Sequence, residues 1–220
     1  MRLGPRLALP LGVFALSRVA IAEPVPSLDL RNFHPPADPA GSLYLEPTAT
    51  PGAGDWNVGA WLSYAHRPVT LEDGSGNRVA IPVKNQLSLD YVAALGILDR
   101  LAVGLTLPTV LYQNGDDVNA ELGDGRLPQT ALGDAAFGLK ATLVPTSSMG
   151  GFGLSALARV TAPTGDSRSY LSDGAVSGEL RLLGELRLIA LAVQATAGAK
   201  VRGAERNYVG QDFGHDLPWG

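Results

Sequence analysis

Apolar and polar residues alternate along most of the chain after its first quarter. In LSALARVTA (154–162), for example, Leu154, Ala156, Ala158 and Val160 share one face. Successive side chains of a β-strand point to opposite faces, so a period of two predicts strands with one apolar face. Seven segments have this period: 56–65, 85–95, 101–109, 133–144, 154–162, 175–183 and 191–201. The sequence therefore predicts an all-β protein of about seven strands.

The connections between these segments alternate between short and long. The short ones are 96–100, 145–151 and 184–190, and the long polar ones are 66–84, 110–130 and 163–174. Such alternation predicts an antiparallel up-and-down meander with two unlike ends. Outer-membrane barrels have this asymmetry, with short turns at one end and longer loops at the other.

The faces of the predicted strands leave two architectures open. In the first, strands of nine to eleven residues cross a bilayer at a tilt, with Leu, Val and Ala toward lipid. The opposite face then lines a polar lumen. The candidate lumen-facing residues are Asp90, Asp134, Lys140, Arg159, Glu179, Arg181 and Lys200. The alternative is a secreted soluble β-sandwich or lipocalin-like small-molecule-binding protein, in which these charges lie on a solvated sheet face.

Four aromatic residues lie near the ends of the predicted strands: Trp56, Tyr64, Tyr91 and Tyr112. Membrane barrels carry girdles of aromatic residues at both interfaces of the bilayer, so these four are candidates for a girdle. Ordinary sheet aromatics would have the same pattern.

The first 22 residues have the composition of an export signal. Arg2 and Arg6 precede an apolar stretch (7–16), and Ala20-Ile21-Ala22 fits a cleavage site after Ala22. We expect three regions: a signal peptide (1–22), a Pro-rich N-terminal leader (23–55) and a barrel (56–220). Removal of the signal changes the formal charge from −4 to −7, because it takes away three arginines and no acidic residue.

Composition and motifs exclude several classes of function. An acidic exported chain lacks the basic face that nucleic acid requires. The absence of cysteine excludes disulfides and thiolate metal sites. No nucleotide-binding or hydrolase motif is present, so we expect no enzyme activity, no cofactor and no metal. An outer-membrane hydrolase that uses Ser169 or Asp173 with a loop histidine stays open as a third hypothesis.

Several pieces of the sequence, spread over most of residues 28–220, resemble one family. They are LDLRNFHP with SLYLE, WNVGAWLSYAHRPVTL, LDRLAVGLTLPTVLYQNG, GFGLSALARVTAPTGD and LSDGAVSGELRLLGELR. In their order and spacing they resemble the N-terminal β-barrel region of OmpA-family outer-membrane proteins of Gram-negative bacteria. Pro163-Thr164-Gly165-Asp166 also resembles a signature of outer-membrane channel and transporter-like barrels.

The resemblance implies a transmembrane β-barrel in the bacterial outer membrane with a structural or passive channel and transport role. The implied partners are outer-membrane lipid, the outer-membrane assembly machinery and, through a region absent from this chain, peptidoglycan. Single-chain bacterial barrels close with even strand numbers, whereas seven strands are predicted here. We therefore expect an incomplete barrel and a chain that is a fragment of a longer protein.

Overall fold

The computed structural model of the chain describes residues 29, 31, 33–42, 44–72, 74–118, 126–148, 150–189, 191–204, 206–208 and 211–213. The predicted signal peptide (1–22) lies outside the described residues.

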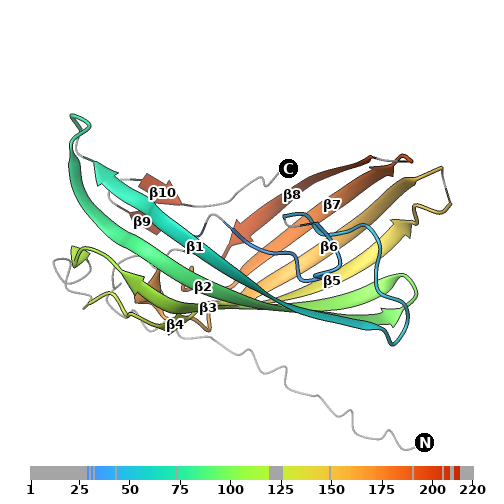
Figure 1. Cartoon of the computed structure of the whole chain (residues 1–220), viewed down its shortest axis with the longest axis horizontal. Helices are drawn as coiled ribbons and strands as arrows, with labels where there is room; N and C mark the ends of the chain where they lie inside the picture. Colours follow the sequence, from blue (N-terminus) through green and yellow to red (C-terminus); the bar gives the residue numbers. More distant parts are fainter. Residues whose placement is uncertain are drawn as a thin grey trace, which may run out of the picture.

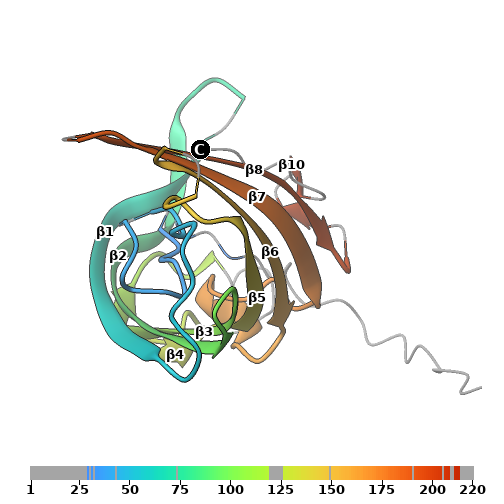
Figure 2. The same ribbon diagram turned by 90° about the vertical axis from the view of Figure 1, so that its right-hand side faces the viewer.

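The fold is a single meander of seven long antiparallel strands, as the alternation of the sequence predicts. Each strand pairs with the next along the chain, in the order β1-β2-β3-β5-β6-β7-β8. The strands are β1 (Trp56–Glu72), β2 (Arg78–Leu98), β3 (Leu101–Asn114), β5 (Ala135–Val144), β6 (Phe152–Ala162), β7 (Ser177–Arg187) and β8 (Ala192–Arg202). The sheet curls into a half-barrel that, within the described residues, stays open between β1 and β8 (Figures 1 and 2).

Three shorter strands and one 3-10 turn complete the described chain. Strand β4 (Ala131–Leu132) adds a short pairing to β3, while β9 (Arg206–Tyr208) and β10 (Gln211–Phe213) form a separate two-stranded sheet. The 3-10 helix η1 (Ser167–Ser169) lies in the connection between β6 and β7.

The two ends of the half-barrel differ in the connections they carry, but residues 66–84 do not form the predicted long loop. Connections of two, seven and four residues (99–100, 145–151 and 188–191) meet at the right-hand end in Figure 1. At the other end, residues 66–84 are mostly strand, because Leu71 pairs with Ala80 and Glu72 with Arg78. The polar composition of this stretch predicted a long connection. Pro68 instead falls within a register shift, where a missing ladder donor is tolerated.

The curled sheet has a buried polar concave face and an exposed apolar convex face. In β2, Ser88 and Asp90 are buried, whereas Tyr91 and Leu95, which follow them on the opposite face, are exposed. The large exposed apolar side chains of the convex face come from all seven strands: Val58, Leu62, Tyr64, Tyr91, Leu95, Val103, Leu105, Phe137, Leu139, Val160, Leu180, Leu182, Val193 and Val201. This partition is the reverse of a soluble sheet, which turns its apolar face to the core.

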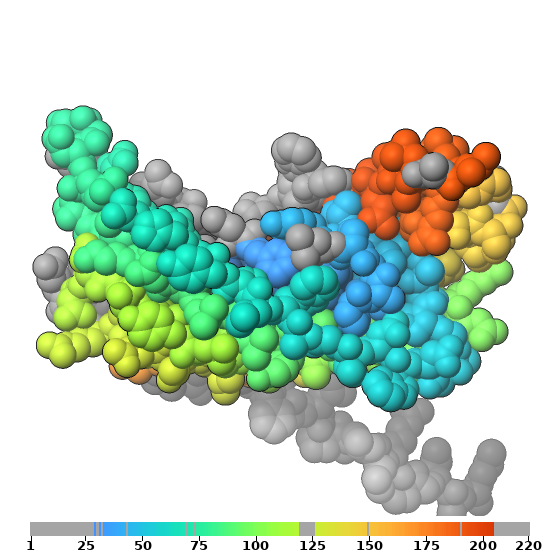
Figure 3. All heavy atoms as spheres, in the orientation of Figure 1, coloured from blue at the N-terminus to red at the C-terminus, as the bar shows by residue number. Residues whose placement is uncertain are grey.

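The hollow of the half-barrel is occupied by what we call the inner segment, Asp29, Arg31 and residues 33–42 and 44–55. It runs along the concave face, where the sequence predicted only a leader, and is visible through the open side between β1 and β8 (Figures 1 and 3). Its C-terminal end is tied to β2, since the amide of Gly54 donates to the carbonyl of Gly96 (2.8 Å). The amide of Gly96 in turn donates to the carbonyl of Asp55 (2.9 Å).

Glycines in the wall let the inner segment lie directly against the sheet. A Cβ at Gly96 would lie 2.0 Å from the carbonyl oxygen of Gly52, and one at Gly104 would lie 2.6 Å from the Cβ of Ala37. Both contacts are shorter than atoms allow. The absence of a side chain at these two positions therefore sets how closely the inner segment approaches.

Substitution of Gly96 tests this packing. Gly96→Ala is expected to lower the free energy of unfolding by about 1–3 kcal/mol, the usual cost of overpacking. The matched control is Gly178→Ala in β7, where a Cβ would meet nothing within 4 Å. The control should change stability by less than about 0.5 kcal/mol. Urea unfolding followed by tryptophan fluorescence measures both, and equal losses would contradict the close approach.

Candidate functional site

The candidate site is the polar interior of the half-barrel together with the inner segment that fills part of it. All seven charged residues predicted to face a lumen lie on the concave side: Asp90, Asp134, Lys140, Arg159, Glu179, Arg181 and Lys200. The structure also brings acidic and basic residues of the inner segment against them. The interior is therefore a network of paired charges.

Arg31 is the first anchor of the inner segment. Its guanidinium lies 2.6 Å from Oδ1 of Asp90 in β2 and 2.7 Å from Oδ2 of Asp29. The Arg31 and Asp90 side chains are almost completely buried, at 8% and 1% exposure. A charge taken out of water is tolerated when it is paired and hydrogen-bonded, so this contact ties the inner segment to the wall.

Glu46 and Asp38 form a second anchor, with Lys140 of β5 and Arg159 of β6. Oε1 of Glu46 accepts hydrogen bonds from Arg159 (3.1 Å) and from the amide of Ala37 (2.6 Å). Nζ of Lys140 lies 3.6 Å from Asp38 and 3.7 Å from Glu46. The two buried carboxylates of the inner segment thus meet the two cations of the wall.

Thr48 forms a third, uncharged anchor near the short-turn end. Its hydroxyl donates to Oε2 of Glu185 in β7 (2.6 Å), and its carbonyl accepts from the hydroxyls of Thr142 (2.8 Å) and Ser155. Neighbouring Thr50 donates to the carbonyl of Asp99 in the β2–β3 turn (3.1 Å). The inner segment is therefore held along its whole described length.

The connection between β6 and β7, predicted as a long polar loop, folds into the interior. Leu171 is fully buried and forms an isolated β-bridge with Asp29. The carboxylate of Asp134 accepts hydrogen bonds from the amides of Gly165 (3.0 Å) and Asp173 (2.9 Å). Asp134 thus holds this loop against the start of β5, because its carboxylate satisfies buried amide donors.

A ladder of charges crosses β6, β7 and β8 on the concave face. The register places Arg159 beside Glu179 and Glu179 beside Lys200. Glu179 also accepts a hydrogen bond from Nε of Arg181 (2.6 Å). Lys200 and Arg202 both approach Asp173, at 3.3 and 3.2 Å. Adjacent strands therefore place alternating charges at cross-strand distance.

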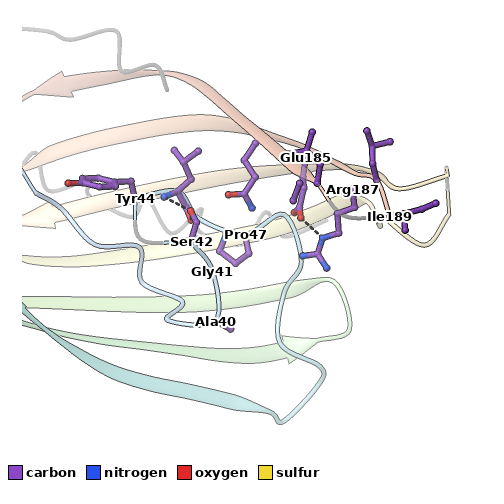
Figure 4. A pocket seen from close by; sticks show the side chains of 13 residues that line it. Ala40, Gly41, Ser42, Tyr44, Pro47, Glu185, Arg187 and Ile189 are labelled. Atoms are coloured by element: carbon purple, nitrogen blue, oxygen red, sulfur yellow. Dashed lines mark hydrogen bonds and ion pairs between the residues drawn. The ribbon is translucent and has the colours of Figure 1, made fainter.

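Two of the hollows beside the inner segment concern the site. The larger of the two, about 850 Å³, lies between residues 40–42 and 44–47 and the end of the β7–β8 hairpin, where Tyr44, Glu185 and Ile189 line it (Figure 4). The smaller, about 220 Å³, lies deeper, among Arg31, Asp90 and the charge ladder. The smaller hollow has the denser array of charged groups.

The four aromatic residues predicted as girdle candidates are all exposed. Tyr64 and Tyr112 lie at one level, since both pair with Leu87. Trp56 lies eight residues earlier on β1, and Tyr91 lies between these levels opposite Ala60. Trp56 and Tyr64 thus mark two heights on the convex face.

The two candidate hydrolase residues, Ser169 and Asp173, both make structural contacts. The hydroxyl of Ser169 donates to the backbone carbonyl of Asp166 (2.6 Å), and Asp173 is paired with Lys200 and Arg202. Among the residues that the structure describes, no cluster of three or more acidic or histidine side chains could hold a metal ion. Within the same residues, no helix is long and apolar enough to cross a membrane.

Sequence reasoning found the charges of the wall but missed those of the inner segment: Asp29, Arg31, Asp38 and Glu46. Wall charges follow a period of two, which marks their face, whereas a Pro-rich extended segment has no period. One signal in the sequence could have found them. The segment has four charged residues, and they complement the charged face predicted for the sheet.

Removal of the Arg31 guanidinium tests the first anchor. Arg31→Met leaves the buried Asp90 carboxylate without its cation and is expected to cost about 3–5 kcal/mol of unfolding free energy. Arg126→Met is the matched control, because Arg126 is 86% exposed and lies 3.5 Å from Asp117. Loss of an exposed pair costs about 0–1 kcal/mol. Similar urea midpoints for both variants would contradict the anchor.

Acid should weaken the same anchor. Burial alone would raise the pKa of Asp29, but Arg31 holds that pKa well below its ordinary value. A carboxyl with a lowered folded-state pKa stabilises the fold above its unfolded pKa of about 4 and loses that contribution as the pH falls further. Unfolding free energy should therefore decline below about pH 4, and Asp29→Asn should make this decline shallower. An unchanged slope in the variant would count against the pairing.

Comparison with protein families, curated proteins and solved structures gives no match to this chain. The geometry of the half-barrel and its interior is therefore the basis for a proposed function.

Proposed function

We propose that this protein is a non-enzymatic outer-membrane β-barrel protein with a structural or passive channel role. The observation that carries the proposal is the reversed partition of the sheet, apolar outside and charged inside. A membrane barrel requires this arrangement, because lipid surrounds its outer face and water or polar groups fill its interior. The proposed partners are outer-membrane lipid and the outer-membrane assembly machinery.

The composition and height of the convex face support a lipid environment. Leu62, Leu180 and Leu182 are 66%, 66% and 56% exposed, a large cost for a sheet in water. From Trp56 to Tyr64 the strand advances by roughly 26 Å along its axis, which is about 20 Å of height at the 35–45° tilt of barrel strands. The apolar band of known outer-membrane barrels is about 25 Å tall between its aromatic girdles.

A soluble sandwich or lipocalin-like carrier accounts less well for the same residues. Such proteins bury apolar side chains inside, to form a core or to enclose an apolar ligand. The interior here holds the ion pairs of Asp90, Lys140 and Arg159. We also propose, from the motif resemblance alone, a relationship to OmpA-family barrels.

The inner segment favours a structural role over a wide open pore. Buried anchors at Arg31, Glu46 and Thr48 hold it across the concave face. Passage of solutes would then be restricted to the hollows beside it.

A charge on the convex face tests the membrane location. Leu180→Arg is expected to lower folding free energy in phospholipid vesicles by about 2–4 kcal/mol, the cost of Arg at mid-bilayer. The control, Val79→Arg, has a similar exposure (68%) but lies at the tip of the β1–β2 hairpin. Its cost should be about 0–1 kcal/mol.

Fractionation gives the complementary measurement. Protein refolded with vesicles should float with them and show a gel mobility that changes on heating. If the protein stays in the aqueous fraction without detergent, and Leu180→Arg is as stable as wild type, the membrane proposal is wrong. If the convex face were in water, Leu180→Arg would not lower the stability, because Leu180 would already be exposed to solvent. If the face is in lipid, the same substitution lowers it.

A further inference from the structure

The 220 Å³ hollow inside the half-barrel has a balanced but unevenly distributed set of charges. Its acidic lining residues are Asp29, Asp90, Asp134, Asp173 and Glu179, and its basic lining residues are Arg31, Arg159, Arg181, Lys200 and Arg202. The two groups cancel, so neither a net anion nor a net cation is favoured by the overall charge. A ligand that matches this hollow is neutral overall and dipolar.

One side of the hollow, formed by β2 and β3, has two buried polar atoms without a hydrogen-bond partner among the described residues. They are Oδ2 of Asp90 and the hydroxyl oxygen of Thr106. Asp90 itself is 0% exposed, and only its Oδ1 is used by Arg31. A buried carboxylate oxygen without a donor is costly, so this pair of atoms is suited to receive a ligand N–H group.

The side formed by β6, β7 and β8 has the opposite character. Arg159, Arg181, Lys200 and Arg202 converge on it from three adjacent strands. Their acidic neighbours are Glu179, Asp173 and, from the inner segment, Glu46. Each of these cations meets a carboxylate, but a guanidinium carries five N–H donors, so the wall is rich in donors that suit a ligand carboxylate.

We propose that this hollow binds a compact zwitterion, a molecule of amino-acid size with one ammonium and one carboxylate group. The ammonium donates to Oδ2 of Asp90 and Oγ1 of Thr106, and the carboxylate lies against Arg181 and the neighbouring cations. A volume of 220 Å³ corresponds to roughly seven water molecules at about 30 Å³ each, enough for a small amino acid. The site depends on the curled sheet and its inner segment, not on the membrane location.

Calorimetric titration of the full chain, refolded in detergent micelles, tests the proposal with three probes. L-Alanine carries both charges, propionate lacks the ammonium and ethylammonium lacks the carboxylate. Alanine should bind saturably with one site per chain. Each single-charge probe should bind roughly ten-fold to hundred-fold more weakly, because a hydrogen bond to a charged group is worth about that factor.

Matched substitutions resolve the two halves of the site. Thr106→Val should weaken alanine binding without lowering the melting temperature, since it removes a hydroxyl that has no partner. Thr109→Val is the control: Thr109 also has a buried hydroxyl without a partner, but it faces the other side of β3. Arg181→Gln should weaken alanine and propionate binding and leave ethylammonium binding unchanged.

A third pair of variants addresses Asp90, which also anchors Arg31. Asp90→Asn should abolish alanine binding, whereas Asp99→Asn, in the exposed β2–β3 turn, should preserve it. The proposal is overturned if alanine gives no saturable binding, or if propionate or ethylammonium binds as tightly as alanine. Equal alanine affinity in Thr106→Val and Thr109→Val would overturn it as well.

Discussion

The pairing of buried charges between the inner segment and the concave wall is the interaction on which the rest of the structure depends. Arg31 with Asp90, and Glu46 with Arg159 and Lys140, join residues that lie 59 to 113 positions apart. Each of these charges would be costly inside a sheet if it stood alone. Together they fill much of the interior, beside a small set of buried apolar side chains that includes Val92, Leu157 and Leu183.

A polar interior leaves the apolar side chains on the outer surface. Alternation along each strand means that a charged inner face is paired with an apolar outer face. Leu180 and Phe137 are consequently exposed on the convex side, where water would make them unfavourable. The proposed membrane location resolves this conflict, because lipid supplies the apolar surroundings that the protein core does not.

The same arrangement explains why a binding site can exist within the interior. An ion-paired network that satisfied every buried group would be purely structural. Asp90 and Thr106 each retain a buried oxygen without a partner, next to a hollow and across from a basic wall. The proposed zwitterion site therefore uses the small part of the network that the inner segment leaves unsatisfied.

Some elements of this fold were predictable from local sequence and others were not. The alternation around Leu154–Ala162 and Ala135–Val144 gave strands that the structure confirms, because period-two patterning is a local property. Residues 66–84 were wrongly predicted as a long polar connection, since their pairing depends on a partner strand and not on a local pattern. The β6–β7 connection was predicted only as a long polar loop, although its Leu171 is completely buried.

The sequence by itself determined the strands, their meander order and which charges share a face, because these follow from alternation and from the lengths of the connections. The tertiary structure alone decided that the inner segment lies within the hollow and that Arg31 meets Asp90. It also decided which oxygens in the interior remain without a partner. Those outcomes depend on the curvature of the sheet and on close approach at Gly96 and Gly104, which no local pattern encodes.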